Sequence, residues 1–241
     1  MKLSRDLIKN LLFIDIETVS QQSEYSDLSE SEKKFWDKKS AYDTEEKTAE
    51  ENYGRSGLFA EFGKIICIGV GGIALEGEKK SLFYKGFFEK DERNILTSFA
   101  RFLEEQEKKR KSPITLCAHN GKSFDFPFIC RRMIVNEVEI PSCLAIHGKK
   151  PWEISHIDTM ELWKFGDNRH MVSLDLLASI LRLPSPKKDI DGSDVHSVYW
   201  KENDLVRIAK YCRSDVHTLA NVFLKFSGEK EIDAQDIIDR E

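Results

Sequence analysis

The stretch LLFIDIET, Leu11 to Thr18, carries the pattern on which both the fold and the search for a functional site depend. Its first four residues are apolar and predict a buried strand, which Asp15 and Glu17 then interrupt. Alternate residues of a strand point to the same face, so both carboxylates should project together from the end of this strand. A buried carboxylate costs several kcal/mol unless a counter-charge or hydrogen bonds compensate it. The two acids are therefore either exposed at a strand end or part of a charged site.

The composition narrows the class of protein. The 241 residues are 40% hydrophobic and 33% charged, which fits an ordinary globular chain of one domain or at most two. The formal net charge of -5 argues against a strongly basic nucleic-acid clamp. No segment of the sequence approaches the ~20 apolar residues that a membrane helix needs. Five cysteines are scattered singly, which indicates free thiols in a reducing compartment, and we expect a cytoplasmic protein.

Hydrophobic patterning places strands early in the chain and helices late. Strands are expected at residues 11–17, 64–73, 80–88 and 113–120. Helices are expected from residue 91 to the charged run EEQEKKRK, from about residue 123, at 173–183 and at 204–226. A short strand followed by a helix is expected within residues 154–165. This order predicts one mixed α/β domain.

Two segments lie outside this pattern. Residues 20–63 are polar and highly charged, and the capping-box pattern from Ser29 to Glu32 predicts one or two amphipathic helices inserted over one edge of the sheet. Residues 227–241 form an acidic tail that we expect to be weakly docked or mobile. The folded domain should therefore span residues 1–226, with the helical insertion after its first strand.

Further acids occur near the ends and middles of other elements. Asp125 lies in HNGKSFDFPF, in the expected first turn of the helix after the fourth strand. An acid there complements the helix dipole, but the polar turn before it lies where open α/β sheets usually place their sites. Tyr211 and Asp215, in YCRSD, are four residues apart on the last helix and share one face. Each signal alone is ordinary for an exposed acid.

The combination of the four acids and the phenol is much less ordinary. If the acids gather in one cleft, they cannot all stay ionised without cations. Carboxylate ligands without a cysteine cluster favour Mg²⁺ or Mn²⁺ over zinc. Two such ions ~3.5–4 Å apart are a standard arrangement for in-line attack on a phosphodiester. The sequence thus predicts two divalent metal ions, Mg²⁺ or Mn²⁺, with the ligands Asp15, Glu17, Asp125 and Asp215.

The segments DIET, NGKSFDFP and YCRSD resemble, in order, the three exonuclease motifs of the DEDD 3′–5′ exonucleases. Within that group the chain is similar to stand-alone proteins related to the proofreading exonuclease domain of family-B DNA polymerases. The YxxxD spacing of Tyr211 and Asp215 matches the tyrosine subtype, whereas Lys210 stands where the other subtype has histidine. The resemblance extends from Asp15 to Asp215, which is nearly the whole chain.

The resemblance implies a ribonuclease-H-like fold whose central mixed sheet has five strands flanked by helices. It also implies a hydrolase that removes nucleotides from the 3′ end of single-stranded nucleic acid, with DNA favoured, and releases nucleoside 5′-monophosphates. The four acids would hold the two metal ions. Tyr211 would orient the attacking water, since a phenol of pKa ~10 is a poor base at pH 7. The implied catalytic residues are Asp15, Glu17, Asp125, Tyr211 and Asp215.

Substrate contacts are expected from residues beside these motifs. Asn120 and Phe124 could hydrogen-bond to and stack on the terminal nucleotide, and Thr18 could meet its phosphate or sugar. Lys188 is the strongest basic candidate, because the similar proteins also carry a lysine-containing loop before a DG turn. Other basic candidates, for each of which solvated surface is the favoured interpretation, are Lys122, Arg131, Arg132 and Lys187. The pair His156 and Asp158 is interpreted as a helix N-cap with a nearby histidine, not as a metal site.

Two alternatives to a DNA exonuclease stay open at this point. One is a non-catalytic ribonuclease-H-like module that binds nucleic acid or a partner. The other is an RNA-directed exonuclease with the same site, because such motifs bind phosphate and metal and do not distinguish the sugar. A proofreading role would require a polymerase or repair partner acting in trans.

Overall fold

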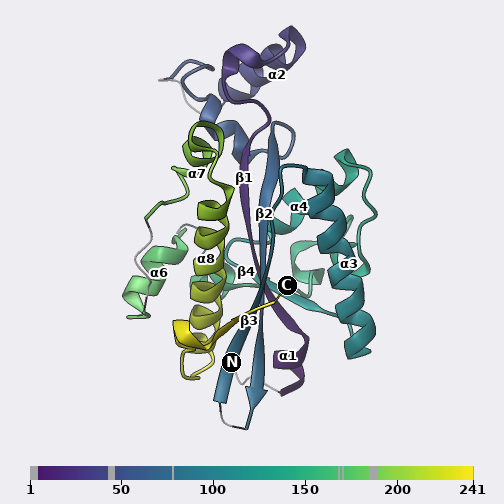
Figure 1. The fold of residues 1–241 in the computed structure, drawn as a ribbon, viewed down its shortest axis with the longest axis vertical. Coiled ribbons are helices and arrows are strands. Elements are labelled where there is room, and N and C mark those ends of the chain that lie inside the picture. The colour runs from purple at the N-terminus through teal and green to yellow at the C-terminus, as the bar shows by residue number, and fades with distance from the viewer. Residues whose placement is uncertain are drawn as a thin grey trace.

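A computed structural model describes residues 5–42, 47–77, 79–167, 169, 171–184 and 189–240. Within them the chain forms one sheet with helices on both faces (Figure 1). The strands are β1 (Leu11–Ser20), β2 (Gly63–Glu76), β3 (Lys79–Phe87), β4 (Thr115–Ala118), β5 (Ile157–Asp158) and β6 (Ile237–Asp239). The α-helices are α1 (Arg5–Asn10), α2 (Glu30–Ser40), α3 (Glu92–Arg110), α4 (Asp125–Val135), α5 (Thr159–Lys164), α6 (Leu174–Ile180), α7 (Val195–Ser197) and α8 (Leu205–Phe226). The shorter helical turns are η1 (Tyr25–Asp27), η2 (Tyr53–Leu58), η3 (Ser142–Leu144), η4 (Pro151–Glu153), η5 (Val198–Glu202) and η6 (Ala234–Asp236).

The sheet mixes parallel and antiparallel strands in the order β5-β4-β1-β2-β3-β6. Strand β2 is antiparallel to β1 and β3, whereas β4 runs parallel to β1, β5 to β4 and β6 to β3. The predicted α/β class, with a central mixed sheet flanked by helices, is confirmed. The predicted count of five strands is low by one, because the C-terminal tail contributes β6. No helix in the described part of the chain is long and apolar enough to cross a membrane.

The C-terminal segment is docked on the sheet, so the expectation of a loose tail is wrong for its described residues. Ile232 is 1% exposed, and its backbone N–H donates to Asn221 Oδ1 on α8 at 2.8 Å. Its carbonyl oxygen lies 2.6 Å from His217 Nε2. Asp239 in β6 pairs with Arg213 at 2.7 Å. The tail is thus anchored both by α8 and by its pairing with β3, and its composition reveals neither partner.

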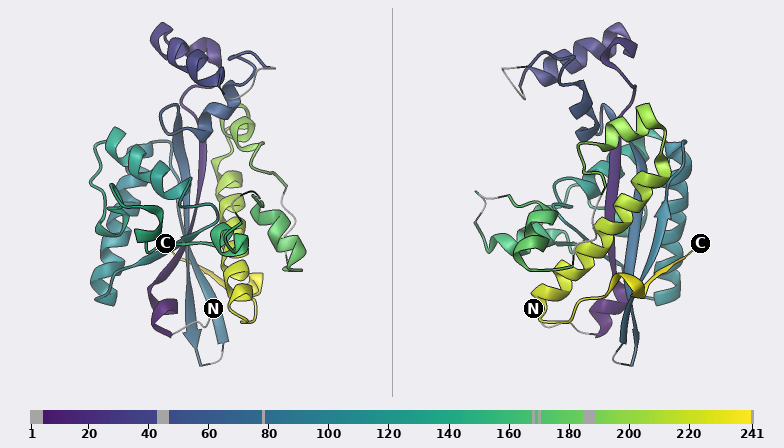
Figure 2. Two further views of the ribbon diagram at one scale, coloured as in Figure 1. Left: turned by 180° about the vertical axis from the view of Figure 1, so that it is seen from behind. Right: turned by 60° about the vertical axis from the view of Figure 1, so that its left-hand side comes forward.

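Strand β1 separates two cores by simple alternation. Leu12, Ile14 and Ile16 pack into the core formed with α3 and α4. Leu11 and Phe13 pack into the core formed with α8. Both ribbon views show α3 and α4 on one face of the sheet and α8 with α6 and α7 on the other (Figures 1 and 2). The same parity carries Asp15 and Glu17 onto the α8 face.

Strand β1 is longer than predicted. It continues to Ser20, which pairs with Gly63 of β2, so Asp15 and Glu17 lie within the strand and not at its end. Thr18 and Val19 are β-branched, which favours this extension. The register between β1 and β2 shifts between Glu17 and Thr18, and such a bulge bends the strand directly after the acids.

The insertion after β1 forms a small helical subdomain around its own apolar cluster. Helix α2 begins with the predicted capping box, in which Glu32 N–H donates to Ser29 Oγ and Ser29 N–H donates to Glu32 Oε2. Trp36 is 1% exposed, its ring centroid lies 6.0 Å from that of Tyr53, and its Nε1 donates to the Ala49 carbonyl at 2.7 Å. The subdomain lies beyond the end of the sheet where β1 leaves and β2 enters, and not over a sheet edge as expected (Figure 1).

Helix α8 packs closely on the sheet because glycines of β2 face it. A Cβ atom on Gly69 would lie 2.8 Å from Cys212 Sγ and 2.9 Å from Val216 Cγ2. Gly69 also pairs with Asp15 across the β1–β2 ladder. The missing side chain of Gly69 therefore lets α8 pack close to β2, which brings Tyr211 and Cys212 near the acids of β1.

Candidate active site

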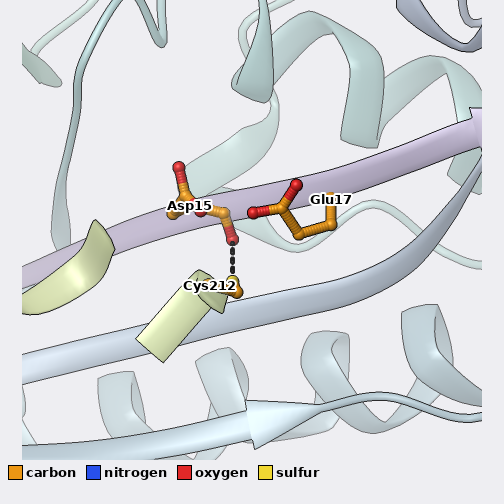
Figure 3. A group of neighbouring side chains, drawn as sticks. All are labelled: Asp15, Glu17 and Cys212. Atoms are coloured by element: carbon orange, nitrogen blue, oxygen red, sulfur yellow. Dashed lines mark hydrogen bonds between the residues drawn. The ribbon is translucent and has the colours of Figure 1, made fainter. Parts of the chain in front are cut away.

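Strand β1 presents Asp15 and Glu17 side by side towards α8. A carboxylate oxygen of each and the Sγ atom of Cys212 lie within 4.8 Å of one another (Figure 3). Glu17 is 7% exposed, whereas Asp15 is partly exposed. Ile14 before the pair and Ile16 between its members are buried, so a rigid strand fixes the positions of the two carboxylates.

Asp125 lies beside β1 but outside the compact group of Asp15, Glu17 and Cys212, and it comes from α4 on the face opposite α8. It is the first residue of α4 and is 5% exposed. Burial raises the pKa of Asp125 to about 7, the charge of Asp158 adds to this, and a hydrogen bond from the Ile16 backbone N–H opposes it. That hydrogen bond places the carboxylate beside the peptide that links Asp15 to Glu17.

The loop before Asp125 is held by a residue that the sequence predicts only as a helix cap. Asp158 is the N-cap of α5 and accepts a hydrogen bond from Met160 N–H at 2.9 Å, which confirms that prediction. It also accepts from the backbone N–H groups of Asn120 at 2.9 Å and Lys122 at 3.1 Å. One carboxylate thus ties the loop ahead of α4 to β5. These partners lie 38 and 36 residues earlier in the chain, beyond the reach of any local pattern.

His156 has the structural role expected of it. Its Nδ1 accepts from Leu116 N–H at 3.2 Å, and its Nε2 lies 2.8 Å from the Cys143 carbonyl oxygen. Burial lowers the pKa of His156 to about 4, so the ring is neutral at physiological pH. Both ring nitrogens are engaged with the backbone, which leaves neither available to a metal.

Helix α8 supplies Tyr211 and Asp215 from the same face. Asp215 is 7% exposed, and the Tyr211 hydroxyl forms a hydrogen bond with its carboxylate. Burial raises the pKa of Tyr211 far above its ordinary value, and the charges of Asp215 and Glu17 raise it further. The phenol therefore stays protonated and donates its proton to the Asp215 carboxylate.

The four acids form one electrostatic cluster. Burial raises the pKa of Glu17 well above its ordinary value, and the charges of Asp15, Asp215 and Asp125 raise it further. No hydrogen bond from any residue that the structure describes offsets this effect on Glu17. Such a concentration of oxygen donors and negative charge fits divalent cations, since an added positive charge would relieve the repulsion.

Cys212 is the member of the cluster that sequence reasoning missed. Its thiol donates to the Asp15 backbone carbonyl at 3.5 Å (Figure 3). Burial raises the pKa of the Cys212 thiol well above its usual range, and contact with Cys67 raises it further. A neutral thiol is a poor metal ligand, so the geometry favours a supporting role beneath Asp15. The sequence feature that could have identified Cys212 is its position directly after Tyr211 in YCRSD.

The residues expected to contact substrate differ in burial, in backbone conformation and in hydrogen bonding. The Thr18 hydroxyl donates to the Gly57 carbonyl at 2.7 Å and so fastens the insertion to β1. Asn120 takes a left-handed backbone conformation, with φ of 63°, in the loop before α4. Phe124 is partly buried, with its ring centroid 5.4 Å from that of Phe128. Lys188 lies outside the described residues, as does Lys187.

Two of the other basic candidates are engaged with acids. Lys122 Nζ pairs with Glu161 at 2.8 Å. Arg132 is 4% exposed and pairs with the buried Glu92 at 2.6 Å, so it serves the core and is wrong as a candidate for a substrate groove. Arg131 is exposed.

Comparison with known proteins gives the chain a family. Residues 59–238 match the family described as predicted 3′–5′ exonucleases related to the exonuclease domain of PolB. The matched residues begin after β1, so they include Asp125, Tyr211 and Asp215 but neither acid of β1. No curated protein matches the chain in sequence.

Two solved structures are similar in backbone. The family-B DNA polymerase of the hyperthermophilic archaeon Pyrobaculum calidifontis is 14% identical with a TM-score of 0.48, covering 89% of this chain and 24% of the polymerase. The RNase domain of yeast Pop2 is 12% identical with a TM-score of 0.39, covering 96% of this chain and 84% of that domain. The chain thus spans about a quarter of the polymerase. The family match covers most of the chain, which therefore belongs to the predicted 3′–5′ exonucleases related to the exonuclease domain of PolB.

Proposed function

We propose that the chain is a two-metal-dependent 3′–5′ exonuclease of the tyrosine subtype that hydrolyses single-stranded DNA from its 3′ end and releases nucleoside 5′-monophosphates. The observation that carries this proposal is the convergence of four acids from three elements around Glu17, with Tyr211 hydrogen-bonded to one of them. The catalytic domain would span residues 1–226, with segment 227–241 completing its sheet.

The acids would hold the two metal ions from three directions. Asp15 and Glu17 supply adjacent donors from the rigid β1 strand, Asp125 supplies one from the start of α4, and Asp215 supplies one from α8. Two divalent ions bound there would supply Lewis-acid activation of a water molecule and stabilisation of the leaving 3′ oxygen. Carboxylate oxygens without a thiolate favour Mg²⁺ or Mn²⁺.

Tyr211 would orient the attacking water. Its raised pKa keeps the proton on the phenol, which donates it to the Asp215 carboxylate, so the hydroxyl oxygen is held in one direction and can accept a hydrogen bond from the water. This favours positioning of the nucleophile by Tyr211 over removal of its proton by a phenolate. Asn120, Phe124 and Thr18 lie beside the metal ligands in sequence and are proposed to contact the terminal nucleotide.

The setting proposed for this activity is the cytoplasm. Five free cysteines, three of them buried, support a reducing compartment. A polymerase or repair protein acting in trans would be the natural partner for proofreading.

The proposal is tested with 5′-labelled single-stranded DNA and RNA of one sequence, incubated with Mg²⁺, Mn²⁺ or EDTA. We expect a ladder of DNA shortened one nucleotide at a time, abolished by EDTA and by Asp15→Asn. Lys34→Gln, an exposed change in α2, is the matched control. Internal fragments would refute exonucleolysis, faster shortening of RNA would refute the DNA preference, and intact substrate that stays bound would support the non-catalytic module.

A further inference from the structure

The turn of residues 191–194, which precedes α7, lies beside the hydroxyl group of Tyr211. A Cβ atom added to Gly192 would lie 3.8 Å from the Tyr211 hydroxyl oxygen. Apart from the two chain neighbours of Gly192, no other heavy atom of the described residues lies within 4 Å of that Cβ position. A side chain at position 192 would therefore leave the backbone beside the phenol oxygen, in a place that the described residues otherwise leave open.

Neither the backbone nor the packing of the turn requires a glycine at position 192. The φ angle of Gly192 lies outside the left-handed region that favours glycine, unlike that of Gly77. Asp194 N–H donates to the Asp191 carbonyl at 3.0 Å, and the second position of such a turn accepts most residues when φ is negative. A Cβ atom 3.8 Å from the Tyr211 oxygen makes only an ordinary van der Waals contact. The remaining physical reason for glycine, close approach of a bound molecule to the backbone, fits this position.

Buried residues on both sides hold the turn in place. Ile190 is 5% exposed and Val195 is 2% exposed, and both pack in the apolar cluster that α8 shares with β1. Tyr211 packs against the same cluster. The turn is therefore anchored to the two elements that carry Tyr211 and the acids of β1, so Gly192 keeps its place relative to the phenol.

The space beside the Tyr211 hydroxyl can hold a water molecule. The hydroxyl donates its proton to Asp215, which leaves its oxygen to accept a hydrogen bond. A water that donates to this oxygen lies about 2.8 Å from it. A Cβ atom at position 192 is compatible with such a water, but a γ-carbon would extend about 1.5 Å further and compete for the same volume. The missing side chain of Gly192 thus keeps the phenol oxygen accessible from the side of the turn.

We propose that the missing side chain of Gly192 keeps open the place of the attacking water beside the Tyr211 hydroxyl. This inference rests on the proposed function, which assigns Tyr211 to the orientation of that water. In an in-line displacement the water and the leaving strand lie on opposite sides of the phosphorus atom. A larger side chain at position 192 should therefore slow the chemical step and leave the binding of the strand unchanged.

The first test measures kcat and KM on dT16 or rU16, whichever the wild type shortens faster. Gly192→Ala should keep about the wild-type kcat, whereas Gly192→Val should lower kcat about tenfold or more at unchanged KM. In the Tyr211→Phe protein the same valine change should have little effect, because the hydroxyl that orients the water is already missing.

The matched control is Gly54→Val. Gly54 is exposed, its φ also lies outside the left-handed region, and no atom of the described part of the chain lies within 4 Å of its Cβ position. This variant should turn over substrate like the wild type.

A second measurement needs neither metal nor activity. Fluorine NMR of protein labelled with 3-fluorotyrosine reports on each ring beside its hydroxyl, and the Tyr211 signal is assigned by its loss in Tyr211→Phe. That signal should shift in Gly192→Val but not in Gly54→Val. A shift would confirm that a side chain at position 192 reaches the phenol.

Three results would overturn the proposal while leaving the proposed function intact. They are an unmoved Tyr211 signal in Gly192→Val, a change confined to KM, and an equal loss of kcat with and without the Tyr211 hydroxyl. Loss of activity in Gly192→Ala as large as in Gly192→Val would also overturn it, by showing that the backbone itself needs glycine. A wild type that shortens neither oligonucleotide would refute the proposed function and, with it, this inference.

Discussion

Replacing Asp125 by Asn should make the metal-free protein more stable, and increasingly so as the pH rises. Burial raises the pKa of Asp125 from 3.8 to about 7 in the folded state. For an acid with a raised folded pKa, the destabilisation is absent below the unfolded pKa and fully developed above the folded pKa. Between pH 5 and pH 8 the side chain should therefore remove about 3 kcal/mol from the free energy of unfolding, by the linkage relation for these two pKa values. Asparagine keeps the shape and the acceptor oxygen without the charge.

The assay is urea unfolding of wild type and Asp125→Asn in EDTA at pH 5, 6, 7 and 8. The difference in unfolding free energy should grow with pH in favour of the variant, because the other titrating groups are common to both proteins. Mg²⁺ or Mn²⁺ should narrow that difference at pH 8 by stabilising only the wild type. A difference that is constant from pH 5 to pH 8, or that favours the wild type more at high pH, would refute the electrostatic account of the cluster.

Three further changes probe the support of the site. Gly69→Ala places a Cβ 2.8 Å from Cys212 Sγ, so α8 should shift and the exonuclease activity of the folded variant should fall at least tenfold. Turnover equal to that of the wild type would contradict the argument that α8 must pack closely on β2. Tyr211→Phe should lower kcat about tenfold to a hundredfold with metal affinity unchanged in a titration, and a change in metal affinity alone would refute water positioning. Trp36→Ala should cost about 3–5 kcal/mol and expose Tyr53 fluorescence in the insertion; unaltered thermal unfolding would show that the insertion does not fold around this residue.

Local patterns in the sequence were enough to assign the acids to their strand or helix, because the hydrophobic residues around each acid repeat with a clear strand or helix spacing. Asp15 and Glu17 are two apart on a strand, and Tyr211 and Asp215 are four apart on a helix, so spacing alone puts each pair on one face. Asp125 follows a strand at the turn where sites collect. A local pattern does not reveal which distant segment each of these residues contacts in the folded chain.

The features that sequence reasoning missed all depend on contacts between distant segments. The tail forms β6 by pairing with β3, and His217 and Asn221 of α8 hold Ile232 ahead of it, although its composition is that of a mobile acidic end. Asp158 secures a loop 36 to 38 residues earlier, and its capping pattern reveals only the local half of that role. Cys212 supports Asp15 from another element and gives no motif of its own.

The alternation of LLFIDIET also explains why fold and site cannot be separated in this chain. Leu11 and Phe13 bury against α8, and Asp15 continues the same parity, so the register that builds the α8 core also points the acids at Tyr211. A slip of one residue would exchange the faces of β1 and drive the carboxylates into the apolar core with α3. The register that forms the fold therefore also brings the acids close together. A divalent cation would offset the electrostatic repulsion between them.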